Sequence, residues 1–291
     1  MMSSPTFDLQ SHSIHSDGEL PPEEVVARAA KAGVELLALT DHDSVAGVAA
    51  ANRAAQRLGI KLIPATEISI VDEAGPDLHL CGYGIDIEHD PLKERLARSR
   101  ADRKERIWRS ANQLQEIGWE VDLAMLQQRI EAGQSVGRPH LAQAVVNCPG
   151  NRPWLEDERI NEPSAFLAAY LIEGKPGFSE RQGPSAAEAI KLIHDAGGVA
   201  VWAHPFWDFE AAAKVEATLT RFTDGGLDGV EAFYTTHDQA QTELVVAAAA
   251  RHSLLTTGSS DFHGPSHSRF SKFRAFQTFD LPVTLGQLND W

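Results

Sequence analysis

The sequence is poor in cysteine, in positive charge and in long apolar runs. Two cysteines among 291 residues cannot build a disulfide framework, so we expect a reducing compartment, the cytoplasm. Lysine and arginine number 26 against 41 aspartates and glutamates, a formal net charge of −15. This balance argues against bulk binding of duplex nucleic acid, which needs a cationic face. The longest apolar run, 244–250, is too short to span a membrane, and 1–7 has no signal-peptide pattern.

What the sequence does contain is a globular composition, with 43% hydrophobic and 23% charged residues, and alternating strand and helix signals. One helix is expected to start at Pro21-Pro22 and stop at Gly33, and the next to be capped by Asp43 and to stop at Gly59. Ser185 and Glu188 match a capping box. The expected strands are 6–12, 36–40, 61–70, 77–85, 199–204, 229–234 and 254–259. Strands that alternate with helices predict an α/β fold with a parallel sheet, either a barrel or an open sheet.

The middle of the chain breaks this alternation. Residues 92–173 show helical periodicity with little strand signal, and 95–109 is the one basic stretch, which we interpret as a solvated helix face. We therefore predict one α/β domain formed by 1–88 and 176–291, interrupted by a mostly helical insertion at 89–175.

Residues that commonly bind metals follow or end several of the expected strands. They are Asp8, His12 and Asp17, then Asp41, His42 and Asp43, then Glu67 and His79, then His204, and last Asp261 and His263. In parallel α/β folds this end of the strands carries the active site. Alternate residues of a strand point the same way, so Gln10 and His12 face one side together, as do Asp261 and His263. A mixed nitrogen and oxygen set suits zinc, iron or manganese, and a carboxylate such as Glu67 can bridge two cations.

The segments DLQSHSIHSDG, TDHDSVAG, LHLCGYGID, AHP and SSDFHGP together resemble the PHP (polymerase and histidinol phosphatase) family. Within it the chain is similar to stand-alone phosphoesterases of the kind that act as nucleoside 3′,5′-bisphosphate phosphatases or RNA 5′-end exonucleases. The resemblance implies a distorted seven-stranded (β/α)7 barrel, with the insertion as a cap, and two or three divalent transition metal ions. It assigns metal-ligand roles to His12, Asp17, His42, Glu67, His79, His204, Asp261 and His263. The family has a histidine where this chain has Gln10.

Further candidates flank the cluster in sequence or lie in the insertion. By resemblance, Arg138 and His140 contact the substrate phosphate and Lys175 lies on the substrate side; an arginine fork suits phosphate. His237 follows the expected strand 229–234 and therefore falls near the same rim. His140 and His237 are both candidates for the leaving-group proton donor, as is a metal-bound water. We expect the aromatic residues around His204 to pack in the core or to form a pocket wall more than to stack on a base.

These observations predict a metal-dependent phosphoester hydrolase. Its substrate would be a phosphomonoester of a nucleotide or a similar small molecule, attacked by metal-bound hydroxide. A 5′-3′ exonuclease that trims short RNA ends is the main alternative, because it shares this chemistry. An amidohydrolase is less favoured, because the sequence has no strand-borne lysine of the kind that such sites use. A non-catalytic metal-binding protein is the alternative that Gln10 suggests.

Overall fold

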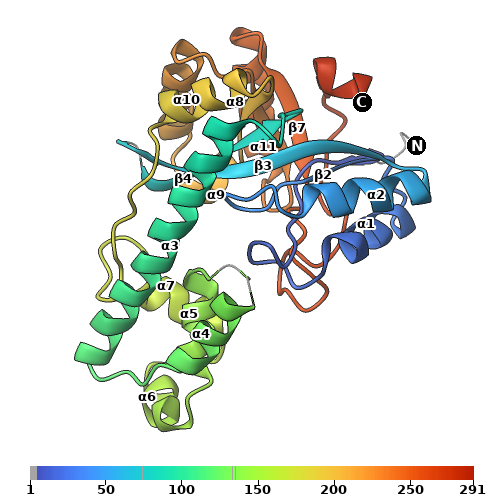
Figure 1. Cartoon of the computed structure of the whole chain (residues 1–291). Helices are drawn as coiled ribbons and strands as arrows, with labels where there is room; N and C mark the ends of the chain where they lie inside the picture. Colours follow the sequence, from blue (N-terminus) through green and yellow to red (C-terminus); the bar gives the residue numbers. More distant parts are fainter. Residues whose placement is uncertain (1–4, 74, 133, 135) are drawn as a thin grey trace. The chain divides into compact units, whose positions relative to one another are not determined.

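The computed structural model describes residues 5–73, 75–132, 134 and 136–291. The chain folds into two compact units (Figure 1). The first consists of Met1–Ala97 and Gly183–Trp291, and the second of Arg98–Gln182. The long helix α3 (Asp90–Glu116) runs from the first unit into the second.

The first unit is built on a seven-stranded sheet whose strands follow one another in chain order. The strands are β1 (Phe7–Asp8), β2 (Leu36–Leu39), β3 (Lys61–Asp72), β4 (Gly75–Tyr83), β5 (Val199–Trp202), β6 (Gly229–Tyr234) and β7 (Leu255–Ser259). Leu9 N–H donates to Gly258 O over 3.1 Å, and Ser11 forms a parallel bridge with Phe262. The two edges of the sheet therefore meet, and the sheet is a nearly closed barrel.

The expectation of a purely parallel sheet is wrong for β4. This strand pairs antiparallel with both β3 and β5, whereas the other neighbouring pairs are parallel. The reason is the length of its connection: β3 ends at Asp72 and β4 begins at Gly75. A link this short can form only a hairpin, because a parallel neighbour requires a crossover of a dozen or more residues.

Helices cover the sheet of the first unit. They are α1 (Pro22–Lys31), α2 (Val48–Leu58), α8 (Ala186–Asp195), α9 (Pro205–Asp208), α10 (Ala212–Asp224), α11 (Gln239–Arg251) and the 3-10 helix η2 (Gly286–Asp290). Gly33 and Gly59 adopt positive φ at the ends of α1 and α2, as predicted, and Ser185 and Glu188 form the capping box of α8. The prediction that Asp43 caps α2 is wrong. Its Oδ1 instead accepts from Ser69 N–H at 3.1 Å, which ties the turn after β2 to β3.

Each unit has its own hydrophobic core. In the barrel the largest buried side chains include Trp202, Tyr83 and Phe233. The second unit consists of most of α3 with α4 (Leu123–Glu131), α5 (Arg138–Val146), η1 (Pro149–Asn151), α6 (Arg152–Asp157) and α7 (Pro163–Tyr170). Its core contains Trp119 against Phe166, with ring centres 5.1 Å apart in a T-shaped pair. Within the described ranges, no helix is long and apolar enough to cross a membrane.

Candidate metal centre

The carboxylate of Glu67, fully buried on β3, lies among four imidazoles. Its Oε1 is 3.0 Å from His79 Nδ1 and 3.1 Å from His204 Nε2. Its Oε2 is 3.2 Å from His12 Nε2 and 3.2 Å from His42 Nδ1. One carboxylate thus presents each of its oxygens to a separate pair of nitrogens, which is the arrangement that a ligand shared between two cations requires.

Two further carboxylates extend the cluster. Asp261 Oδ1 lies 3.0 Å from His12 Nε2 and 3.6 Å from His263 Nδ1. Asp17 lies 3.4 Å from His263 Nε2, 3.6 Å from His42 Nε2 and 3.8 Å from His12 Nδ1. All the side chains predicted as metal ligands are therefore neighbours in the barrel, although they come from distant parts of the chain.

The elements explain this convergence only in part. His12, His42 and His204 follow β1, β2 and β5, as expected, but Glu67 and His79 lie within β3 and β4 and not at strand ends. The parallel pairing of β2 with β3 stops at Pro64. Beyond that residue β3 continues as a hairpin with β4, which carries both side chains along the rim.

Hydrogen bonds hold the ring nitrogens of two histidines in a state suited to a cation. Ser16 Oγ donates to Asp41 Oδ1 at 2.7 Å and so can accept from Nδ1–H of His12 at 3.2 Å. Nδ1–H of His263 donates to Asp261 O at 2.7 Å. With Nδ1 as the donor, the Nε2 lone pair of each ring faces the cluster, as in metal-bound histidine.

Several contacts that support the site were not predicted from the sequence. Asp41 accepts from Ser13 N–H and from Ser13 Oγ–H, both at 2.7 Å, and so ties the turn after β1 to the turn after β2. Glu231 accepts from His204 N–H at 2.9 Å, and Tyr234 Oη donates to Asp261 at 2.7 Å. A glutamate inside the otherwise apolar strand GVEAFY was the signal available for Glu231.

The charges of the cluster perturb one another strongly. Burial alone would raise the pKa of Asp17, but His42 and His263 outweigh it and hold the pKa well below its usual range. Burial alone would lower the pKa of His204, but Glu67 and Asp208 raise it to about 10. His204 therefore holds its proton tightly beside these carboxylates, and a cation that binds there must displace that proton.

The donor set fits divalent ions. Imidazole nitrogens and carboxylate oxygens are suitable ligands for zinc, iron or manganese. Several buried atoms have no hydrogen-bond partner within the described part of the chain: Glu67 Oε2, Asp17 Oδ1, Asp261 Oδ1 and both side-chain polar atoms of Gln10. Buried polar atoms without partners are costly, and bound cations would satisfy these oxygens.

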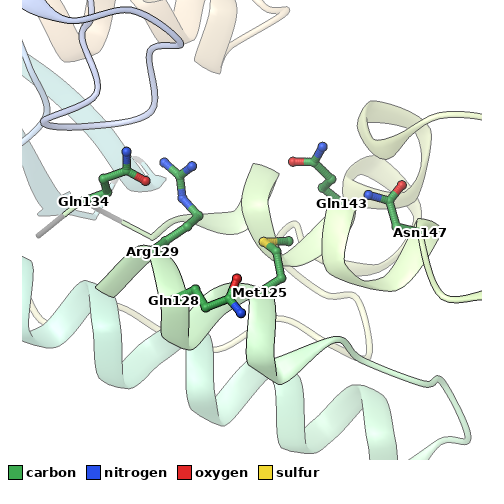
Figure 2. A pocket seen from close by; sticks show the side chains of 6 residues that line it. All are labelled: Met125, Gln128, Arg129, Gln134, Gln143 and Asn147. Atoms are coloured by element: carbon green, nitrogen blue, oxygen red, sulfur yellow. The ribbon is translucent and has the colours of Figure 1, made fainter. Parts of the chain in front are cut away.

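The predicted substrate residues belong to the second unit. Arg138 opens α5, and its Nη1 donates to Leu171 O at 3.3 Å. His140 is buried, and its Nδ1 accepts from Gly137 N–H at 3.1 Å. Lys175 is exposed beyond α7. A pocket in the same unit is lined by other residues, namely Met125, Gln128, Arg129, Gln134, Gln143 and Asn147 (Figure 2).

His237 is buried in the barrel unit beyond β6, with both of its ring nitrogens bonded. Nδ1–H donates to Ala232 O at 3.0 Å, and Nε2 accepts from Phe206 N–H at 3.3 Å. Burial lowers its pKa to about 4. At neutral pH the ring is therefore neutral and anchors the turn that follows His204, whereas a proton donor must carry its proton at the working pH.

Comparison with known proteins gives a consistent picture. The family model described as PHP domain matches residues 8–137. The chain is 34% identical over 263 residues to the 5′-3′ exoribonuclease Rnm of Escherichia coli, a match that covers 89% of this chain and 85% of that protein. It is 32% identical over 259 residues to a 3′,5′-nucleoside bisphosphate phosphatase of Chromobacterium violaceum, covering 89% and 87%.

A solved structure is similar over nearly its full length. A protein of Bifidobacterium adolescentis described as a metal-dependent phosphoesterase superposes with a TM-score of 0.79 at 26% identity. The match covers 99% of this chain and 96% of that one. The barrel and the helical unit thus both have counterparts in that protein.

Proposed function

We propose, from the premise that this chain belongs to the PHP domain family, that it hydrolyses a phosphomonoester of a nucleotide or a similar small phosphorylated molecule. The chain is a metal-dependent phosphoesterase. The observation that carries the proposal is the carboxylate of Glu67 among four imidazoles, flanked by Asp17 and Asp261. Because both cysteines are free, we propose a reducing compartment, the cytoplasm.

The contacts suggest how two or three ions would be held. The first group is His12, Glu67 and Asp261, with Gln10 as an added oxygen donor. The second is Glu67, His79 and His204. The third is Asp17, His42 and His263. Bound divalent ions would lower the pKa of water toward neutrality and stabilise charge on the phosphoryl oxygens.

The protein's own residues would prepare this site. Ser16 and Asp41 fix the His12 ring, and Tyr234 fixes Asp261 by donating to its second oxygen. We assign the 89–175 insertion to the substrate side. There the guanidinium of Arg138 offers a bidentate fork for phosphate, and His140 and Lys175 offer further polar contacts.

A 5′-3′ exoribonuclease activity is the second candidate. The similarity to the Escherichia coli protein of that name favours it, and the same hydrolysis applied to the end of a short RNA would produce it. Because the chemistry is shared, the two candidates differ in the length of substrate accepted and not in the metal cluster.

The test combines metal removal with a substrate panel. Protein dialysed against a chelator should release no phosphate, and added manganese, zinc or iron should restore release. Metal analysis of the protein as purified should find at least two ions per chain. The panel is adenosine 3′,5′-bisphosphate, a short 5′-phosphorylated RNA and an amide substrate. Full activity in verified metal-free protein, or hydrolysis of the amide alone, would refute the proposal.

A further inference from the structure

An exposed aromatic side chain lies close to the metal centre along the chain. Trp207 is three residues after His204, on the short helix α9, and its side chain is 47% exposed. Trp202 and Phe206, the other aromatic residues around His204, are placed differently. Trp202 is buried in the core, and Phe206 packs edge-on against His237 with ring centres 5.6 Å apart. Of these three rings, only Trp207 presents a large area to solvent.

A series of ring contacts connects Trp207 to the metal cluster. The centre of its ring is 6.5 Å from that of Tyr234, which is 5.2 Å from that of His204. Tyr234 also donates to Asp261. The Trp207 ring is therefore no further from the His204 ring than these two distances together, so Trp207 lies at the border of the metal cluster.

Residues of the loop after β7 also contact Trp207. Phe270 lies edge-on to Trp207, with ring centres 5.4 Å apart, and 5.7 Å from His263. The Arg269 guanidinium lies over one face of the Trp207 ring, 5.7 Å from its centre, which leaves the opposite face for a base. An exposed indole beside a guanidinium is the combination that proteins use to stack a base and to contact its edge or its phosphates.

We propose that Trp207, supported by Phe270 and flanked by Arg269, is a stacking platform for the nucleobase of the substrate. This inference rests on the proposed function and adds to it. The metal cluster selects a phosphoester, and Trp207 selects one that carries a base. Stacking depends on the π face that every base has, so the platform should tolerate different bases.

The test compares a nucleotide with the same phosphate lacking its base. The variant Trp207→Leu should lower kcat/KM for adenosine 3′,5′-bisphosphate by at least about tenfold, mainly through KM. Trp207→Leu should leave kcat/KM for the abasic sugar 3,5-bisphosphate unchanged. Trp207→Phe should restore part of the kcat/KM that Trp207→Leu loses on the nucleotide. The matched control is Trp291→Leu, since Trp291 is 44% exposed on the same unit but lies against Gly84, beyond the end of β4.

Binding is measured separately from turnover. Adenosine 3′,5′-bisphosphate should quench tryptophan fluorescence of the parent and quench it much less in Trp207→Phe. A 5′-phosphorylated RNA run in parallel shows which substrate uses the platform: a loss on either one that the abasic compound does not share supports stacking. Equal losses on the nucleotide and on the abasic compound, or no loss on any substrate, would overturn the platform. If the parent hydrolyses no phosphoester, the proposed function fails, while the quenching comparison still decides whether Trp207 stacks a base.

Discussion

His237 is expected to make the barrel sensitive to acid. Burial lowers its pKa to about 4 from the ordinary 6.5. Because folding depresses this pKa, the neutral ring contributes stability above about pH 6.5, and that contribution is lost as the pH falls toward 4. The difference of about 2.5 units corresponds to roughly 3 kcal/mol once the pH is below both values. At pH 5 the loss should already be about 2 kcal/mol.

The perturbation that isolates this effect is His237→Gln. Glutamine does not titrate, and its amide offers both the acceptor that Phe206 N–H needs and a donor for Ala232 O. Urea unfolding of the parent and of the variant, in chelator, at pH 7.5 and pH 5 gives four free energies of unfolding. The parent should lose about 2 kcal/mol more than the variant between the two pH values, and titrations common to both proteins cancel in this comparison.

One result would contradict the expected acid sensitivity of His237. Equal losses in parent and variant would mean that His237 is protonated in the folded barrel at pH 5. In that case Phe206 N–H would have lost its acceptor and the ring could donate a proton. His237 would then return as a candidate for protonating the leaving group.

Substitutions at four further positions test the site. Glu67→Gln should remove bound metal and activity together, because both ions share this carboxylate; an unchanged metal count with near-normal turnover would mean that Glu67 does not bridge. Arg138→Ala should lower kcat/KM at least about tenfold with unchanged metal content, and equal kinetics would mean that Arg138 does not hold the substrate phosphate. Gln10→His should shift metal preference toward zinc, which competition between zinc and manganese measures; an unchanged preference would place residue 10 outside the ligand set. Burial raises the pKa of Glu231 to about 8, so Glu231→Gln should be tolerated. Glu231→Leu leaves His204 N–H without its acceptor and should lower the unfolding free energy by about 1–3 kcal/mol. Equal stability of the two variants would argue against a role of Glu231 as this acceptor.

The sequence predicted the strands well where local patterns determine them. The strand at 229–234 was predicted with its observed bounds, and the ends of α1 and α2 followed from Gly33 and Gly59. Asp43 was misplaced for a physical reason: α2 begins only at Val48, with Gly47 in the cap position, and the Asp43 carboxylate accepts from a backbone N–H of β3. That partner is distant in sequence, so no local pattern could indicate it.

The candidate site, too, could be predicted from the sequence only in part. Most of its histidines and carboxylates could be picked out because they follow or end apolar strands, whereas Glu67 and His79 lie within β3 and β4. Their roles as ligands remain predictions. The contacts that support them could not be found in this way. Asp41 reaches Ser13 over 28 positions and Glu231 reaches His204 over 27. Such pairs can be identified only in the folded barrel.

The reversed strand β4 shows why an antiparallel pair suits this cluster. Glu67 pairs with Cys81 and Ser69 with His79, so Glu67 and His79 are diagonal neighbours on one face of the hairpin. Their contact of 3.0 Å needs no loop to position either side chain. A parallel crossover would have ended each strand separately and left both residues on connections that can move. The hairpin instead places the proposed bridging carboxylate and one of its partners on adjacent hydrogen-bonded strands, where side-chain geometry is held most rigidly.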